Sequence, residues 1–325
     1  MSFQRNSSYI TSRCLLVLVC LIGVLVVVIA RSNQWLNKVS HNGFDLINAS
    51  IAVTDIYAGG PPKDGISALL HPKFTVTDQI TYLQDSDRVL GVERNGIAKA
   101  YPIRILVWHE IVNDDFNGTA TVVTYCPLCG TGMTFDAQLK GRRLTFGVSG
   151  LLYNSDMLLY DHQTESLWSQ LLMQAVSGQF KGAELALLPI RHTTWGDWKE
   201  RFPETLVLSS NTGFSRDYGR TPYMGYEQSP ALYFPVKHQD DQFHPKEMVL
   251  GVDYQGVTKA YPFSILSGLN QPVHDEIARQ AMLVLYDGKN ESAHITTAEG
   301  VEIPSVMAYW FAWFTFHPET DIYSK

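Results

Sequence analysis

The sequence predicts a strand-rich α+β body carried by an apolar N-terminal segment. Three observations support this fold class: an uncharged run at residues 14–30, a repeated segment that predicts hairpin, helix and strand in that order, and a mixed stretch between the two copies. The chain has 325 residues, of which 45% are hydrophobic and 18% charged, as in an ordinary globular protein.

Residues 14–30 predict a signal anchor or a signal peptide. Arg5 and Arg13 precede this run, and no acidic residue does. The run is at the short end of the ~17–25 residues that span a bilayer, and it exceeds the ~7–15 apolar residues of a cleavable signal. We therefore expect residues 1–31 to anchor the chain in a membrane, with the body outside the cytoplasm, periplasmic or extracellular. If the segment is cleaved instead, the body is secreted.

Residues 32–44 indicate a tether, and residues 45–325 indicate a single globular body. Three of the 25 basic residues precede residue 32 and none of the 32 acidic residues does, so the rest of the chain carries 22 basic against 32 acidic residues. An acidic body without a Lys/Arg run argues against nucleic acid as a partner. No P-loop and no G-x-G-x-x-G motif occurs, so we expect no nucleotide cofactor. The sequence identifies no protein partner.

The body contains an internal repeat, about residues 88–136 and 248–290. VLGVERNGIAKAYP (89–102) and VLGVDYQGVTKAYP (249–262) agree at nine of fourteen positions. Asn95-Gly96 between two strand-like runs predicts a hairpin, and the proline that follows can open a short helix. The buried strand TATVVTY (119–125) comes next. The sequence therefore predicts a duplicated hairpin–helix–strand unit.

The segment between the copies predicts short strands and one helix. RRLTFGVSG, MLLYD and TLVLSS are strand-like, and SLWSQLLMQAVSG (166–178) has helical spacing with a closing glycine. The aromatic run AYWFAWFTFHPET (308–320) is most simply buried, although it is also a candidate partner surface. We expect a mixed α+β body with more strand than helix.

Cys126 and Cys129 are the main candidate for chemistry. They are the only cysteines after the apolar run, in TYCPLCGTGMTFD, whereas copy two continues Tyr-Asp-Gly-Lys-Asn. A C-P-x-C-G turn can present two sulfurs to one ion, and soft thiolates outside the cytoplasm favour copper or zinc. His109, absent from copy two, is the expected third ligand. Whether such a site serves metal handling or catalysis stays open.

Two alternatives use the same pair of cysteines. A thiol–disulfide oxidoreductase needs a thiolate at a helix N-terminus, and Gly-Thr-Gly-Met-Thr-Phe-Asp is a poor helix start. A structural disulfide in a non-catalytic scaffold or interaction protein is the third possibility, although so short a loop gains little from closure.

Further polar residues between apolar ones could line a pocket or supply ligands. Several of them cluster in YNSD and DHQTESLWSQ. The candidates are Glu110, Asn154, Asp156, Asp161, His162, Trp168 and Arg216. Turn chemistry and a helix cap at Thr164 or Ser166 are the structural alternative for these two segments, and an internal ion pair is the alternative for Arg216.

Several long segments together resemble a known family. GGPPKDGI (59–66), KAYPIRILVWHEIVND (99–114), TYCPLCGTGMTFD (124–136), GLLYNSDMLLYDHQTESLWSQ (150–170) and TGFSRDYGRTPY (212–223) resemble the bacterial domain of unknown function 3179 family. The resemblance covers most of residues 45–320 and implies an exported or membrane-anchored protein. It supplies no catalytic residues.

Overall fold

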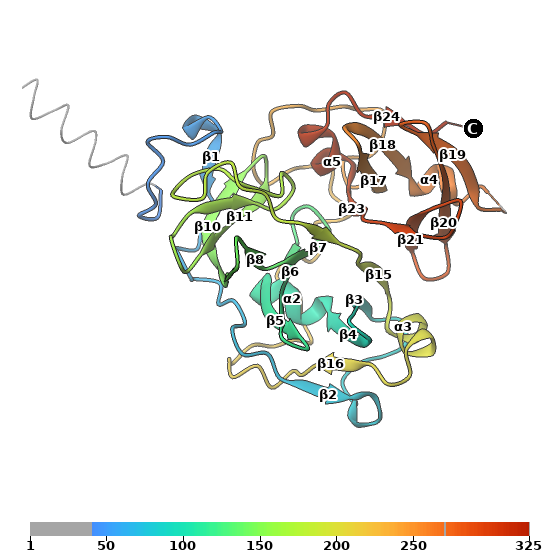
Figure 1. Ribbon diagram of the computed structural model, residues 1–325, viewed down its shortest axis with the longest axis horizontal. Coiled ribbons are helices and arrows are strands. Elements are labelled where there is room, and N and C mark those ends of the chain that lie inside the picture. Colours follow the sequence, from blue (N-terminus) through green and yellow to red (C-terminus); the bar gives the residue numbers. More distant parts are fainter. Residues whose placement is uncertain (1–40, 270, 325) are drawn as a thin grey trace, which may run out of the picture.

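Five small β-sheets follow one another around the body in a β-propeller arrangement (Figure 1). The computed structural model describes residues 41–269 and 271–324, so the expected anchor and most of the tether lie outside the described residues. Strands make up 40% and helices 11% of the described residues. No helix among the described residues is long and apolar enough to cross a membrane.

The first three sheets hold the first copy of the repeat and the segment after it. One sheet is β1 (Ile56–Ala58), β10 (Phe146–Tyr153), β11 (Asp156–Asp161), β12 (Leu167–Ser169) and β13 (Gln174–Ala175). The next is β14 (Leu187–Leu188), β7 (Thr131–Asp136), β6 (Thr119–Cys126) and β5 (Ile111–Phe116). The third is β15 (Arg191–Thr194), β3 (Arg88–Arg94), β4 (Ile97–Pro102), β16 (Leu206–Leu208) and β2 (Phe74–Val76).

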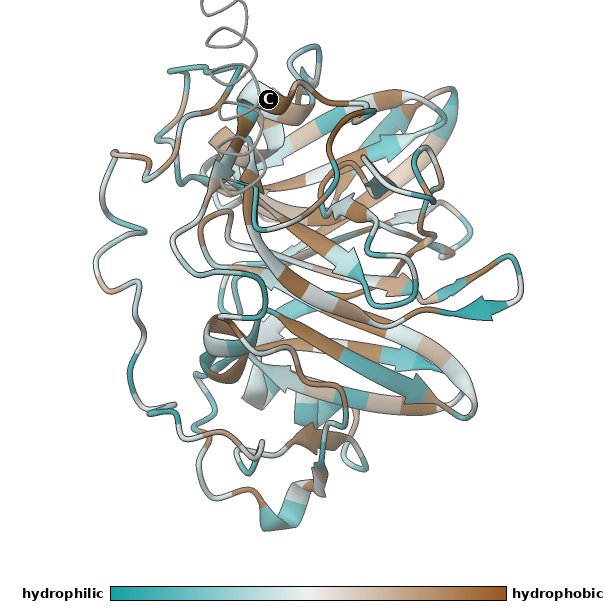
Figure 2. Cartoon of the chain, turned by 90° about the vertical axis from the view of Figure 1, so that its left-hand side faces the viewer, coloured by the Kyte–Doolittle hydropathy of each residue, from teal (hydrophilic) through white to brown (hydrophobic). Residues whose placement is uncertain are grey.

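The last two sheets hold the second copy. They are β23 (Val306–Tyr309), β17 (Met248–Tyr254), β18 (Val257–Pro262) and β24 (Asp321–Ile322), then β19 (Val273–Ile277), β20 (Gln280–Asp287), β21 (Ser292–Thr297) and β22 (Glu302–Ile303). A small hairpin, β8 (Gln138–Leu139) and β9 (Arg142–Arg143), stands apart. Hydrophobic and hydrophilic residues alternate along several strands, as expected for blades with unlike faces (Figure 2).

The prediction of an α+β body was wrong, because the helices are only short connectors. They are α2 (Ile103–His109), α3 (Trp195–Arg201), α4 (Phe263–Leu266) and α5 (Trp310–Phe316), with two 3₁₀ turns at η1 (Val53–Asp55) and η2 (Thr77–Gln79). The helix α2 ends where Glu110 takes a φ of 58°, and the chain continues directly as a strand. The helix expected over 166–178 is instead β12, a turn and β13, because both faces of these strands are buried and the sequence lacks clear alternation.

The repeated unit is present but crosses from one blade to the next. Its hairpin forms the inner strands of one sheet, and after the short helix the following strands build the neighbouring sheet. The turns Asn95-Gly96 and Gln255-Gly256 have positive φ at both residues, as two-residue hairpin turns of the primed type require. Each copy keeps a lysine–aspartate pair between the two sheets, Lys99–Asp114 at 2.9 Å and Lys259–Asp275 at 2.7 Å.

A second part of the repeat completes each hairpin blade. Trp195, Trp198 and the tripeptide Pro203-Glu204-Thr205 recur as Trp310, Trp313 and Pro318-Glu319-Thr320. The indole nitrogens of Trp198 and Trp313 donate to Thr205 Oγ1 at 2.9 Å and to Thr320 Oγ1 at 3.0 Å. The aromatic run at 308–320 is therefore a buried blade element, as its simplest interpretation expected.

Candidate metal centre

Cys126 and Cys129 lie in the tight turn between β6 and β7. Cys126 pairs with Thr131 at the base of the hairpin, and the Cys129 amide donates to the Cys126 carbonyl oxygen at 3.2 Å. Gly130 has a φ of +63°, and a side chain there would collide with the ring of Tyr309, 2.8 Å from an ideal Cβ position. The turn therefore needs its glycine both for its backbone conformation and for its contact with the second copy.

The sulfur atoms of Cys126 and Cys129 lie close to the carboxylate of Asp156. Cys126 Sγ, Cys129 Sγ and a carboxylate oxygen of Asp156 lie within 4.8 Å of one another, and all three residues are buried. Both cysteines are free thiols. The Ser155 carbonyl oxygen is the nearest backbone acceptor, 3.4 Å from Cys129 Sγ and 3.9 Å from Cys126 Sγ. Asp156 therefore belongs to the cysteine turn, although thirty residues separate it from Cys126.

The Asp156 carboxylate accepts from the Leu171 amide and contacts both thiols. Asp156 opens strand β11, directly after Asn154 and Ser155, which both have positive φ. Its Oδ2 atom accepts from the Leu171 amide at 3.0 Å, whereas Oδ1 is buried without a hydrogen-bond partner. An unpaired buried carboxylate oxygen costs free energy, so a ligand for Oδ1 would stabilise the site.

Burial raises the pKa of three acidic groups in and beside this cluster. It raises the pKa of the Cys129 thiol well above the usual value, and the neighbouring Cys126 and Asp156 raise it further. Burial also raises the pKa of Asp156 to about 7. Glu110 has a pKa of about 8, raised by burial and then by the charge of Asp156. A cation that entered this cluster would displace protons from both thiols.

His109 is not part of the group formed by Cys126, Cys129 and Asp156. Its Nδ1 lies 2.7 Å from the Ser67 carbonyl oxygen, and its Nε2 lies 2.6 Å from the Tyr218 hydroxyl. Both ring nitrogens are thus occupied. The group within ligand distance of the thiols contains Asp156 and not His109.

The remaining sequence candidates are divided among several structural roles. Asn154 Oδ1 accepts from the Lys237 amide at 3.0 Å. Asp161 accepts from Trp168 Nε1 at 2.9 Å, at the far end of strand β11 from Asp156. His162 Nδ1 lies 3.1 Å from Thr145 Oγ1, and Arg216 donates to the Ser215 carbonyl oxygen. These side chains do not join the ligand group of the thiols.

Sequence reasoning missed a tyrosine-rich strap over the cysteine turn. Residues 209–237 contain no helix or strand. The strap is fastened by Tyr218 to His109 and by the Phe234 carbonyl oxygen, which accepts from Ser155 Oγ at 2.7 Å. Tyr226 is buried with its hydroxyl unpartnered, and the thiols contribute to its raised pKa. The density of tyrosine between residues 218 and 233 was the available signal.

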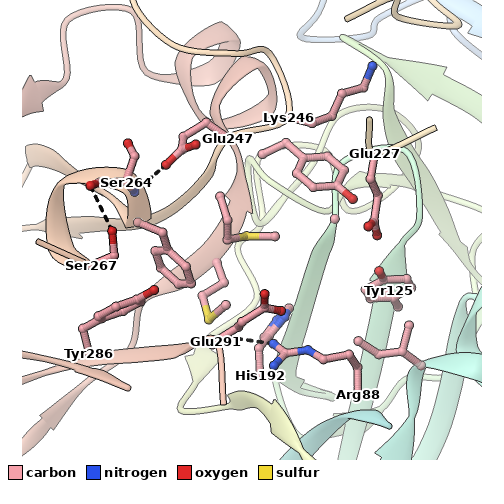
Figure 3. Close-up of a pocket in the computed structure, with 16 residues that line it drawn as sticks. Arg88, Tyr125, His192, Glu227, Lys246, Glu247, Ser264, Ser267, Tyr286 and Glu291 are labelled. Carbon is pink, nitrogen blue, oxygen red and sulfur yellow. Dashed lines mark hydrogen bonds between the residues drawn. The ribbon is translucent and has the colours of Figure 1, made fainter. Parts of the chain in front are cut away.

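A cavity of about 470 Å³ reaches the cysteine turn from the other side (Figure 3). Gly130 and Tyr125 contribute to its wall, together with Arg88, His192 and Tyr309. A second cavity of similar volume lies beneath the strap and includes Pro127 and Tyr226 in its lining. The candidate metal centre is thus flanked by two spaces large enough for a small molecule.

The chain belongs to a family of proteins of unknown function. The family model described as "Protein of unknown function (DUF3179)" matches residues 63–301, which include the cysteine turn, Asp156 and most of the second copy. The resemblance found in the sequence is thereby confirmed as to family. No curated protein and no solved structure matches the chain.

Proposed function

We propose that this protein binds a zinc ion through Cys126, Cys129 and Asp156. The observation that carries the proposal is the grouping of two free thiols with an unpartnered buried carboxylate oxygen. Ligand atoms around a tetrahedral zinc ion lie about 3–4 Å apart, given bonds of roughly 2.0–2.3 Å. The observed grouping within 4.8 Å therefore needs only a small contraction.

The ligand set favours zinc over copper(I), the other metal expected from the sequence. Zinc accepts thiolates and carboxylates together, whereas copper(I) selects soft sulfur ligands. Three protein ligands leave one position of a tetrahedral ion for water or for a further side chain. Glu110 is the candidate side chain, because its carboxyl group is buried, lies within the electrostatic reach of Asp156 and has no hydrogen-bond partner among the described residues.

The geometry does not favour the thiol–disulfide alternative. Catalytic cysteines are exposed and have a lowered pKa, often at a helix N-terminus. Here Cys126 ends a strand, the turn leads into another strand, and both thiols are buried. A raised thiol pKa gives little nucleophilic thiolate at neutral pH.

Elemental analysis tests the metal proposal. The full-length chain is purified under reducing conditions without chelator, beside a Cys126→Ser/Cys129→Ser double variant and an Asp156→Asn variant. We expect near-stoichiometric zinc in the wild type, none in the double variant and a 10-fold or greater loss of zinc affinity in Asp156→Asn. His109→Gln is the matched control and should retain its zinc. A wild-type protein that stays free of zinc after zinc is offered would rule out this function.

We also propose that residues 1–31 anchor the body outside the cytoplasm. The support is the uncharged run at 14–30, preceded by two arginines. In such an oxidising compartment two adjacent thiols would oxidise unless a ligand protected them, which agrees with a metal role. Protease added to intact cells or spheroplasts should digest a C-terminal tag, and alkaline washing should leave the chain in the membrane fraction.

A further inference from the structure

The cavity beside the cysteine turn lies between the two copies of the repeat. The Tyr309 amide of copy two donates to the Cys129 carbonyl oxygen at 2.8 Å. In the reciprocal contact, Thr194 Oγ1 of copy one donates to Asn290 Oδ1 at 2.6 Å. Each copy therefore docks its turn against the other, and residues of both copies line the cavity. Equivalent positions of both copies consequently face one another across it.

The two walls of this cavity differ although the copies share a fold. Five equivalent pairs line it: Arg88 and Met248, His192 and Met307, Tyr125 and Tyr286, Ile103 and Phe263, Gly130 and Glu291. Copy one contributes a guanidinium and an imidazole where copy two contributes two thioethers. Copy two also contributes polar groups, the carboxylates of Glu247 and Glu291 and the hydroxyls of Ser264 and Ser267, beside its apolar side chains. The lining as a whole therefore suits a ligand that has both hydroxyl groups and an apolar face.

The polar wall has hydrogen-bonding capacity left over. Arg88 uses one N–H on the Asn290 carbonyl oxygen and another on that of Glu291, which leaves three of its five. His192 is buried, its Nε2 contacts Gly132, and its Nδ1 has no partner among the described residues. Tyr125 is 7% exposed, and its hydroxyl likewise has no partner there. Figure 3 shows Arg88, His192 and Tyr125 together along one side of the cavity.

The charges around the cavity favour a neutral ligand. Both cationic side chains of the cavity already donate to backbone carbonyl oxygens. Lys246 donates to those of Ser229 and Ala231, and Arg88 donates to those of Asn290 and Glu291. Three carboxylates also line the cavity: those of Glu227 and Glu291 lie near Arg88, and that of Glu247 accepts from the Ser264 amide at 2.6 Å. A strong anion would meet these carboxylates, and a strong cation would meet Arg88.

We propose that this cavity binds a saccharide unit. A neutral ligand with many hydroxyl groups can use the spare donors and acceptors of Arg88, His192 and Tyr125 without adding charge. A sugar ring also has an apolar C–H face, which suits Met248 and Met307. The volume of about 470 Å³ accommodates one or two sugar rings. This site is independent of the metal centre, and it stands whether or not zinc binds.

Ligand-observed NMR and calorimetry test the assignment. The probes are glucose, galactose, mannose, N-acetylglucosamine and their β-linked disaccharides, with glucuronate and glucosamine as charged counterparts. The full-length chain is prepared in a detergent without a sugar headgroup. We expect at least one neutral sugar to bind, and to bind at least 10-fold more tightly than its charged counterpart.

Two variants locate the binding. Arg88→Met and His192→Met install the residues of copy two at the equivalent positions, and each should weaken sugar binding at least 10-fold. Arg142→Met, at an exposed position outside the cavity, should leave it unchanged. Should Arg88→Met fail to fold, His192→Met decides alone. Absence of binding by every neutral sugar, tighter binding of a charged probe, or unchanged affinity in the folded variants would overturn the proposal.

Discussion

Replacing Asp156 with asparagine should stabilise the metal-free protein at alkaline pH. Asn keeps the shape of the side chain, and its carbonyl oxygen can still accept from the Leu171 amide. The substitution removes only the negative charge. Because the pKa of Asp156 is raised from 3.8 to about 7 in the folded protein, the folded state binds more protons than the unfolded state between these values.

The sign and size of the effect follow from this shift. Stability of the wild type falls as pH rises from about 4 to about 7, and the loss is complete above pH 7. Three pKa units correspond to about 4 kcal/mol at 1.36 kcal/mol per unit. We therefore expect Asp156→Asn to raise the free energy of unfolding by up to ~4 kcal/mol at pH 8 and by under ~2 kcal/mol at pH 5.

Urea titrations at pH 5 and pH 8, followed by tryptophan fluorescence with chelator and reductant present, measure both values. Asp161→Asn is the control, since that buried carboxylate accepts from Thr164 and Trp168. Its loss should destabilise the fold at both pH values by ~1–3 kcal/mol. Zinc at a thousand times its wild-type Kd should add about 4 kcal/mol to the wild type and at most about 2.7 kcal/mol to Asp156→Asn, whose zinc affinity is expected to be at least 10-fold lower. A pH-independent or destabilising effect of Asp156→Asn would refute the reasoning.

The other predictions concern the scaffold and the thiols. Asp114→Asn leaves Lys99 charged and buried, so it should cost ~3–5 kcal/mol in urea unfolding, and the matched Asp275→Asn in copy two should cost less because that pair is more exposed. Gly251→Ala should cost at least ~3 kcal/mol and broaden the fluorescence transition, because its Cβ would lie 2.3 Å from the Trp313 ring; wild-type stability in this variant would contradict the packing. Both free thiols should react with a disulfide reagent at the rate of unfolding rather than at that of exposed cysteines, and zinc should slow the reaction further.

Local features of the fold were readable from the sequence, whereas its assembly was not. The hairpin at Asn95-Gly96 follows from residues that tolerate positive φ. Which sheet each of the following strands joins cannot be read from local residues. It depends on contacts between distant segments, such as the pairing of β16 with β4. The repeat of Trp195 and Trp198 in Trp310 and Trp313 was legible and would have extended the duplicated unit to a complete blade.

The candidate site was predicted in part for the same reason. Cys126 and Cys129 are close because only two residues of a turn separate them, and this follows from chain geometry alone. The partnership with Asp156 depends on how β10 and β11 pack against the cysteine turn, which no local pattern encodes. His109 was the favoured ligand because it is near in sequence, yet α2 directs it to Ser67 and the strap.

The second copy of the repeat contains the equivalent turn without cysteines. Its turn places Asp287 and Asn290 at the positions equivalent to the two cysteines, and Asn290 Nδ2 donates to Asp287 Oδ2 at 2.8 Å. That hydrogen bond closes the copy-two turn within the chain. In copy one the same two positions hold thiols, which contact each other and the Asp156 carboxylate. The blade folds with either pair, so the fold alone does not account for the thiols or for the unpartnered oxygen of Asp156, which agrees with the proposed metal site.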